Sequence, residues 1–122
     1  MTLPKRVKIV EVSPRDGLQN EVQLVSADLK IELINLLVAA GVSFIEAGSF
    51  VNPRWVPQMA NSDTVFAGIK GAKNVNFSAL VPNLRGFERA IEAGVKEISI
   101  FTSASESFSK KNTNRSIQAS LA

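Results

Sequence analysis

The segment Leu36–Ala47, LLVAAGVSFIEA, decides the fold, because it predicts a helix end, a glycine and a buried strand in direct succession. Gly41 stands where a glycine commonly ends a helix in the left-handed conformation. Ser26 is the expected N-cap of this helix. Its apolar residues recur at helical spacing and form one stripe: Leu29, Leu33, Leu36, Leu37 and Ala40. The opposite side carries Asp28, Lys30, Glu32 and Asn35. The same junction recurs at Ala93-Gly94-Val95, which indicates repeated βα units.

Four apolar, β-branched segments predict strands: Val7–Val12, Ser43–Ala47, Val75–Val81 and Glu97–Phe101. Further helices are expected from Asn83 to Gly94, from about Ser62 to Lys70, and from about Thr113 to the end of the sequence. The resulting order of strands and helices favours a parallel sheet with helical crossovers. Composition and periodicity leave two architectures open, a closed barrel and an open doubly wound sheet.

The composition is that of a globular chain. Of its 122 residues, 45% are hydrophobic and 20% are charged, which fits one domain with one core. No apolar run reaches membrane-spanning length, and no signal peptide is predicted, so we expect a cytoplasmic protein without a membrane partner. A scattered net charge of +3 does not predict a nucleic-acid partner. The basic cluster of Lys110, Lys111 and Arg115 is either solvated surface or a contact for an anionic ligand.

The chain has no cysteine and no histidine. These absences exclude disulfides, thiolate zinc sites, Ser-His-Asp triads and imidazole metal ligands within this chain. Any acid–base chemistry must therefore use Asp, Glu, Lys, Arg or water. No glycine-rich GxGxxG or P-loop motif predicts a dinucleotide or nucleoside triphosphate.

Polar residues follow each predicted strand at its carboxyl end: Pro14-Arg15-Asp16-Gly17, Glu46 to Ser49, Pro82-Asn83, and Thr102-Ser103. Parallel α/β folds bind ligands at this edge of the sheet, so four loops are expected to converge on one site. Trp55, held between two prolines, is expected either to pack against the protein or to form a wall facing the ligand.

The Arg-Asp-Gly sequence at residues 15–17 allows two interpretations. Asp16 offers a hard oxygen suited to Mg²⁺ or Mn²⁺, and Arg15 offers a permanent cation for an oxyanion. An Asp-Gly after a strand is also an ordinary turn. Glu46 and Glu11 stand in apolar strands and therefore need partners. They form either a structural ion-pair network with Arg15 or an active site with shifted pKa values.

Four longer segments carry a resemblance to a known family: VEVSPRDGLQNE (10–21), EAGSFVNPRWVPQM (46–59), VPNLRGFE (81–88) and SASESFSKKN (103–112). Together they resemble the 3-hydroxy-3-methylglutaryl-CoA lyases, and the resemblance covers essentially the whole chain. The Arg-Asp-Gly sequence is shared with the wider metallolyase superfamily, which includes isopropylmalate and homocitrate synthases. The stretch from Ser49 to Met59 points to the lyases in particular.

The resemblance implies a (β/α)₈ TIM barrel, of which residues 1–122 are the N-terminal half of a single catalytic domain with about four βα units. It implies retro-Claisen cleavage of 3-hydroxy-3-methylglutaryl-CoA to acetyl-CoA and acetoacetate, as in leucine degradation, by a homodimer. It assigns Asp16 to a Mg²⁺ or Mn²⁺ ion, Arg15 to the substrate carbonyl and Glu46 to catalytic support. It further implies that the acyl-CoA substrate contacts Gln19, Ser49 and Asn83.

The sequence also departs from the family, which completes its metal site with a His-x-His pair and an Asn from later strands and uses a catalytic loop with a cysteine. Because this chain has no His and no Cys, we expect it to be inactive alone. Its open sheet edges predict association or aggregation. Two alternatives stay open, a truncated non-catalytic half-barrel and another Claisen-type metallolyase related to isopropylmalate or homocitrate synthase.

Overall fold

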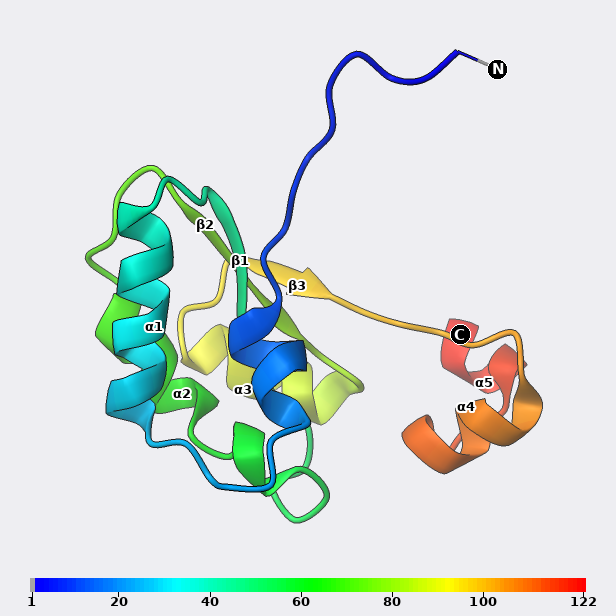
Figure 1. The fold of residues 1–122 in the computed structure, drawn as a ribbon. Helices are drawn as coiled ribbons and strands as arrows, with labels where there is room; N and C mark the ends of the chain where they lie inside the picture. Colours follow the sequence, from blue (N-terminus) through cyan, green and yellow to red (C-terminus); the bar gives the residue numbers. More distant parts are fainter. Residues whose placement is uncertain (1) are drawn as a thin grey trace.

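The computed structural model describes residues 2–122 and shows one parallel sheet with helices packed against it (Figure 1). The strands are β1 (Phe44–Ser49), β2 (Asn76–Leu80) and β3 (Glu97–Ser99), in the order β1-β2-β3. The α-helices are α1 (Ala27–Ala39), α2 (Ser62–Ile69), α3 (Leu84–Glu92), α4 (Glu106–Thr113) and α5 (Ile117–Leu121). Two short turns complete the fold, the π-helix η1 (Ser13–Gly17) and the 3₁₀ helix η2 (Pro57–Met59). No helix between Thr2 and Ala122 is long and apolar enough to cross a membrane.

The core lies between one face of the sheet and helices α1 to α3. Its buried apolar side chains come from all of these elements: Ile34, Ile45, Ala47, Val65, Phe66, Ile69, Ala79 and Ala90. Burial of this apolar surface is the main force that holds the βα units together. The parallel arrangement predicted from the helix–glycine–strand junctions is confirmed.

The predicted helix ends are also confirmed. The Oγ of Ser26 accepts a hydrogen bond from the backbone N–H of Leu29, and the Oδ1 of Asn83 accepts one from the N–H of Gly86. Gly41 and Gly94 have φ values of 93° and 79°, in the left-handed region that a glycine adopts without strain after a helix.

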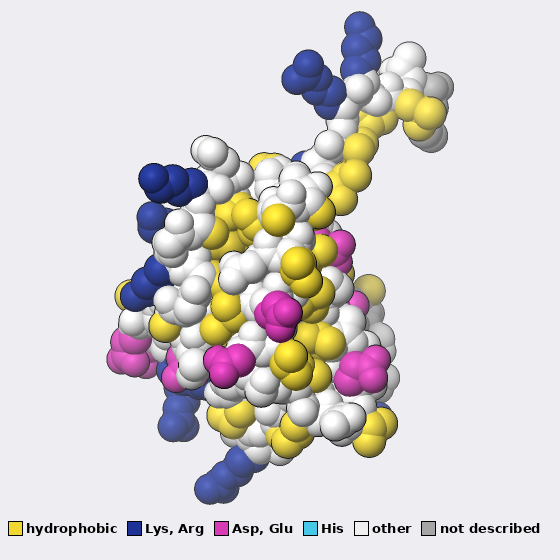
Figure 2. Space-filling view, turned by 60° about the vertical axis from the view of Figure 1, so that its left-hand side comes forward, with side chains coloured by type: hydrophobic (Ala, Val, Ile, Leu, Met, Phe, Trp, Pro, Cys, Tyr) yellow, Lys and Arg dark blue, Asp and Glu magenta, His cyan; other side chains and the backbone are white. Residues whose placement is uncertain are grey.

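The predicted strand Val7–Val12 is wrong. Only Glu11 pairs with the sheet, through an isolated parallel bridge to Ile45. The segment before Glu11 projects from the body of the molecule, and Val7 and Ile9 are exposed (Figures 1 and 2). A strand is stabilised by a ladder of hydrogen bonds and a covered face, and this segment has neither in the described structure. The β-branched composition predicted a strand because it could not show the lack of a partner.

The C-terminal helices also differ from the prediction. Helix α4 was not predicted, and the next helix begins at Ile117 rather than near Thr113. Helix α4 is polar around most of its circumference, so it has no apolar stripe. Its capping pattern could have predicted it, because Ser105 caps its N-terminus and Glu106 lies in its first turn. Figure 1 shows α4 and α5 beyond an extended connection from β3.

Helix α1 buries only part of the predicted stripe. Leu37 packs against the core, and Ile34, outside the predicted stripe, is fully buried. Leu29 and Leu36, by contrast, are exposed. The predicted polar side of α1 included Lys30, which is buried. The helix carries two adjacent apolar stripes, so periodicity alone could not decide which of them faces the sheet.

Candidate active site

A buried ion pair connects η1 to β1. The Nε of Arg15 donates a hydrogen bond to Oε1 of Glu46 across 2.5 Å, and the two side chains are 16% and 8% exposed. The π-helical turn orients Arg15 because the carbonyl of Val12 accepts hydrogen bonds from three successive N–H groups, those of residues 15–17. The partner that a carboxylate in an apolar strand requires is therefore Arg15.

Arg15 lies between two carboxylates. Its Nη1 donates a hydrogen bond of 3.1 Å to Oδ1 of Asp16, whose side chain is 58% exposed. The three charges sum to a local excess of one negative charge, which favours a cation on the exposed side of Asp16. This geometry is compatible with both interpretations of Asp16, as a residue of an ordinary turn and as a metal ligand, because its carboxylate stays accessible.

A divalent cation fits this donor set only in part. Asp16 supplies the hard oxygen that Mg²⁺ or Mn²⁺ prefers. Across residues 2–122, however, no group of three or more His, Cys, Asp or Glu side chains could hold a metal ion. Asp16 is therefore suited to be one ligand of a cation whose other ligands are not in the described part of the chain.

Glu11 is not a member of this network. Its Oε1 accepts a hydrogen bond of 2.9 Å from the backbone N–H of Ser13, and this bond lowers the pKa of the Glu11 carboxyl. The backbone of Glu11 pairs with β1 on both sides of Ile45, at Phe44 and Glu46. Glu11 thus holds the start of η1 against β1, while Arg15 pairs with Glu46 and Asp16.

A cavity of about 670 Å³ opens at the carboxyl edge of the sheet. Three of the predicted site residues line it: Arg15, Gln19 and Asn83. An aromatic side chain and two cations from other segments also line it: Trp55, Lys111 and Arg115. Residues from η1, the β1–η2 loop, the end of β2 and the α4–α5 region therefore meet here, as expected for the edge of a parallel sheet. The exposed ring of Trp55 forms part of the wall.

Ser49 lies elsewhere. It is fully buried at the end of β1, and its Oγ donates to the carbonyl oxygen of Leu80 across 3.1 Å. Its backbone N–H donates to the Oγ of Ser62. Ser49 therefore ties β1 to β2 and α2, and it does not line the cavity that contains Arg15.

A buried lysine that the sequence did not indicate as special takes part in a polar network at η2. Lys30 is 2% exposed, and its Nζ donates to the carbonyl oxygen of Gln58 and to Oδ1 of Asn61. Its desolvation lowers the pKa of the ammonium group. The amide of Gln58 in turn bonds backbone groups of residues 21–25, the segment that follows Gln19. This network fixes the loop after η1 to the turn that follows Trp55.

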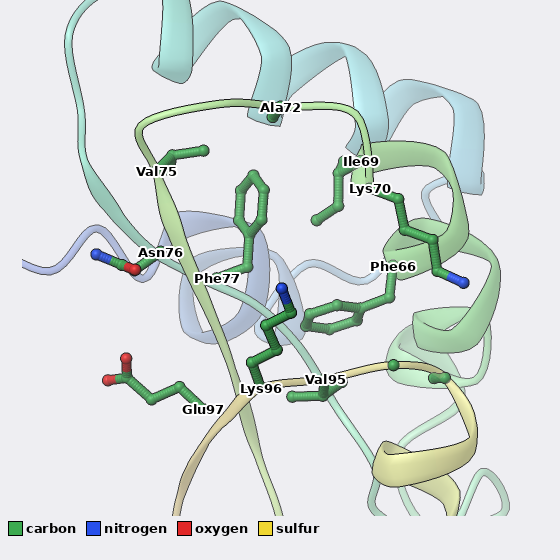
Figure 3. Close-up of a pocket in the computed structure, with 12 residues that line it drawn as sticks. Phe66, Ile69, Lys70, Ala72, Val75, Asn76, Phe77, Val95, Lys96 and Glu97 are labelled. Atoms are coloured by element: carbon green, nitrogen blue, oxygen red, sulfur yellow. The ribbon is translucent and has the colours of Figure 1, made fainter.

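A second cavity of about 590 Å³ lies at the opposite end of the sheet, near the amino ends of β2 and β3 (Figure 3). Phe66, Ile69 and Phe77 form its apolar walls, and Lys96 extends over it. It contains none of the predicted site residues. Since ligands of parallel α/β folds bind at the carboxyl edge, the cavity that contains Arg15 is the better candidate.

A parallel βα repeat with a charged cavity at the carboxyl edge of its sheet defines a parallel α/β protein. The comparisons with known proteins place it in the TIM-barrel type. The chain belongs to the HMGL-like family, which matches residues 6–122. The resemblance seen in the sequence and the fold that it implied are both confirmed.

Individual relatives carry the same signal. The chain is 58% identical over 121 residues to the 3-hydroxy-3-isohexenylglutaryl-CoA/hydroxy-methylglutaryl-CoA lyase of Pseudomonas aeruginosa. The alignment covers 99% of this chain and 40% of that protein. The crystal structure of hydroxymethylglutaryl-CoA lyase from Pseudomonas aeruginosa superimposes with a TM-score of 0.90 at 58% identity, again covering 99% of this chain and 40% of that one.

A third relative was solved with ligands. The HMG-CoA lyase from Acinetobacter baumannii, in complex with coenzyme A and 3-methylmalate, has a TM-score of 0.86 and 41% identity, and covers 99% of this chain and 40% of that one. The present chain thus spans about 40% of the length of the relatives that it matches.

Proposed function

We propose that residues 1–122 form part of a single catalytic barrel domain that cleaves 3-hydroxy-3-methylglutaryl-CoA to acetyl-CoA and acetoacetate, a reaction of leucine degradation. The observation that carries the proposal is the buried Arg15–Glu46 pair at the cavity that Gln19 and Asn83 also line. Family membership and the three lyase relatives support it. The homodimer implied by the resemblance is part of the same proposal.

The reaction needs a group that stabilises negative charge on the thioester. A base removes the proton of the tertiary hydroxyl, and the carbon–carbon bond breaks as the hydroxyl carbon becomes the ketone of acetoacetate. The electron pair of that bond moves onto the acetyl-CoA fragment as an enolate, which takes up a proton to give acetyl-CoA. Arg15 is the permanent cation best placed for the enolate oxygen, because Glu46 holds its Nε and leaves other N–H donors at the cavity. A guanidinium fixed before the reaction stabilises the transition state without reorganising.

The other residues bind and orient the substrate. The side-chain amides of Gln19 and Asn83 can each donate to or accept from a polar group in the cavity. Lys111 and Arg115 bring two more cations, which suit the anionic groups of an acyl-CoA. Asp16 would hold a bound Mg²⁺ or Mn²⁺, which would acidify the substrate hydroxyl and orient it.

A chimaera tests this proposal. The chain would replace the matching segment of the Pseudomonas aeruginosa lyase, whose remaining length supplies the rest of the barrel. We expect metal-dependent release of acetoacetate from 3-hydroxy-3-methylglutaryl-CoA by the chimaera and no appreciable release by the chain alone. A chimaera that folds, as judged by circular dichroism, but leaves this substrate intact would contradict the proposal.

The same chimaera separates the lyase from a condensing synthase. The Arg-Asp-Gly sequence alone fits both kinds of enzyme. Turnover of acetyl-CoA with a 2-oxo acid, without cleavage of 3-hydroxy-3-methylglutaryl-CoA, would identify a synthase related to isopropylmalate or homocitrate synthase.

A further inference from the structure

Three arginines surround a separate cavity of about 800 Å³ beside the candidate active site. They are Arg54 from the β1–η2 loop and Arg85 and Arg89 from α3. Asn52 and Asn83 line both this arginine cavity and the cavity that contains Arg15, so the two cavities adjoin.

The charges of the arginine cavity are not compensated. The ion pairs found among residues 2–122 involve Arg15 and Lys8 but none of these three arginines. Three guanidinium groups at one cavity repel each other unless an anion lies between them. Arg15 differs from these three arginines, because two carboxylates, those of Asp16 and Glu46, compensate its charge.

Arg89 is held in place before any ligand binds. Its Nη1 donates to the carbonyl oxygen of Val51 across 3.2 Å, and its guanidinium carbon lies 5.6 Å from the ring centroid of Phe50. The planar guanidinium has five N–H donors, so most remain available to a ligand. Arg54 and Arg85 are exposed and flank Arg89 at the cavity.

We propose that the arginine cavity binds a phosphoryl group. Guanidinium groups match the geometry of phosphate oxygens and bind them through pairs of parallel hydrogen bonds. A dianion also satisfies several cations at once, which a single carboxylate cannot do as well. The first turn of α3 contributes as well, since Arg85 has a backbone N–H with no acceptor among the described residues.

Two sources of this phosphoryl group are possible in chemical terms. It belongs either to the nucleotide end of an acyl-CoA whose acyl end occupies the adjoining cavity, or to a separate phosphorylated compound. The first source rests on the proposed function, whereas the binding site itself does not.

Protection from chemical modification tests the site on the chain as it exists. Phenylglyoxal modifies exposed arginines, and peptide mass spectrometry reports the modification of each one. We expect inorganic phosphate to protect Arg54 and Arg85 in a saturable manner and to leave Arg6, on the projecting N-terminal segment, unprotected. Equal protection of Arg6 and the two cavity arginines, or protection of none, would overturn the proposal.

Equilibrium dialysis of radiolabelled phosphate gives the affinity and does not depend on the association state of the chain. Arg85→Gln and Arg89→Gln should each weaken phosphate binding about tenfold, as expected for the loss of a hydrogen bond to a charged group. Lys73→Gln removes the same charge from an exposed position in the α2–β2 loop and should change the affinity less than about twofold. If all three variants bind alike, the attraction is unspecific and the site is refuted.

Acetyl-CoA, adenosine 3′,5′-bisphosphate and pantetheine then distinguish the sources. If the phosphoryl group belongs to an acyl-CoA, acetyl-CoA should protect the arginines better than adenosine 3′,5′-bisphosphate, and Arg15→Gln should weaken only acetyl-CoA, because Arg15 is assigned to the thioester carbonyl. If the two compounds protect equally and Arg15→Gln changes neither, the site stands and belongs to a separate compound. Pantetheine lacks phosphate, and protection by it would contradict phosphoryl recognition.

The chimaera separates failure of this site from failure of the proposed function. A chimaera that cleaves its substrate without binding phosphate would refute this site and leave the proposed function intact.

Discussion

Arg15 and Glu46 join two parts of the chain that are 31 residues apart, through a hydrogen bond of 2.5 Å between Nε and Oε1. Both side chains lie largely out of solvent. The pair fixes the guanidinium at the wall of the cavity, so that its orientation depends on β1 as well as on the π-helical turn η1 that carries Arg15. A group that stabilises a short-lived oxyanion needs this kind of rigid support.

The pair should show strong energetic coupling. Glu46→Ala leaves a buried cation without its partner and should lower the free energy of unfolding by about 3 kcal/mol. Arg15→Ala leaves the opposite charge and should have a similar effect. The double variant should be less destabilised than the sum of the single variants, because it removes both charges together. Urea unfolding of the four proteins measures the coupling, and additive effects would show that the two side chains do not interact.

In the active chimaera, Arg15→Gln should lower kcat by roughly 10²-fold, like the loss of an oxyanion-hole donor. The affinity for the metal ion should hardly change, since the metal ligand is proposed to be Asp16. Arg6→Gln, on the projecting segment, is the matched control and should leave kcat unchanged. If KM rose while kcat stayed the same, Arg15 would bind substrate and transition state equally.

Asp16→Asn should weaken metal binding, because it removes the accessible anionic oxygen next to Arg15. We expect the dissociation constant for Mn²⁺ to rise roughly tenfold, which corresponds to about 1.4 kcal/mol. The electron paramagnetic resonance signal of free Mn²⁺ measures it in the chimaera. Asp28→Asn, in the first turn of α1, removes an equal charge elsewhere and serves as the control. Equal affinity in all three proteins would refute Asp16 as a ligand.

The sequence predicted the parts of the fold that depend on local interactions. Ser26, Asn83, Gly41 and Gly94 were assigned to helix ends, and all four hold these positions, because caps and left-handed glycines are determined by neighbouring residues. The strand expected at Val7–Val12 was wrong, since strand formation depends on pairing partners that a local pattern does not show.

The site was predictable in chemical terms but not in detail. The resemblance contributed Gln19, and the rule that ligands bind at the carboxyl edge brought Arg15 and Asn83 to the cavity that Gln19 also lines. The rule could not show that Ser49 is buried behind that edge, because the side-chain direction at the end of β1 follows from a register shift between Glu46 and Gly48. Helical periodicity placed Lys30 on the polar side of α1, whereas Lys30 is buried, because the choice of the buried stripe is made by tertiary packing.

Lys30 should make the stability of the chain rise with pH in the alkaline range. Desolvation lowers its pKa in the folded state below the ordinary value of 10.5. Between these two values the unfolded chain holds more protons than the folded chain, so the free energy of unfolding increases with pH. Below the lowered pKa, Lys30 is protonated in both states and contributes no slope. Its two hydrogen bonds survive deprotonation, because a neutral amine keeps two N–H donors.

Lys30→Met tests this prediction. Urea unfolding at a series of alkaline pH values should show a smaller positive slope for the variant than for the parent chain. Lys73→Met removes an exposed lysine and should keep the slope of the parent. An unchanged slope in Lys30→Met would show that burial of Lys30 does not affect its titration.

The isolated chain should associate with itself. Strand β3 lies at one edge of the sheet, and its outer N–H and C=O groups have no strand partner among residues 2–122. Ile100, just beyond β3, is 78% exposed, and Ile98 and Phe101 are also exposed. An uncovered edge with apolar side chains is a template for pairing with another chain, and a net charge of +3 gives little repulsion.

Size-exclusion chromatography with light scattering should show dimers or larger species. Ile100→Lys should shift them toward the monomer, because edge lysines oppose pairing. Leu3→Lys, on the projecting N-terminal segment, adds the same charge at an exposed apolar position away from β3 and should leave the distribution unchanged. A monodisperse monomer in the parent chain, with slow hydrogen exchange in β3, would show that this edge does not drive association.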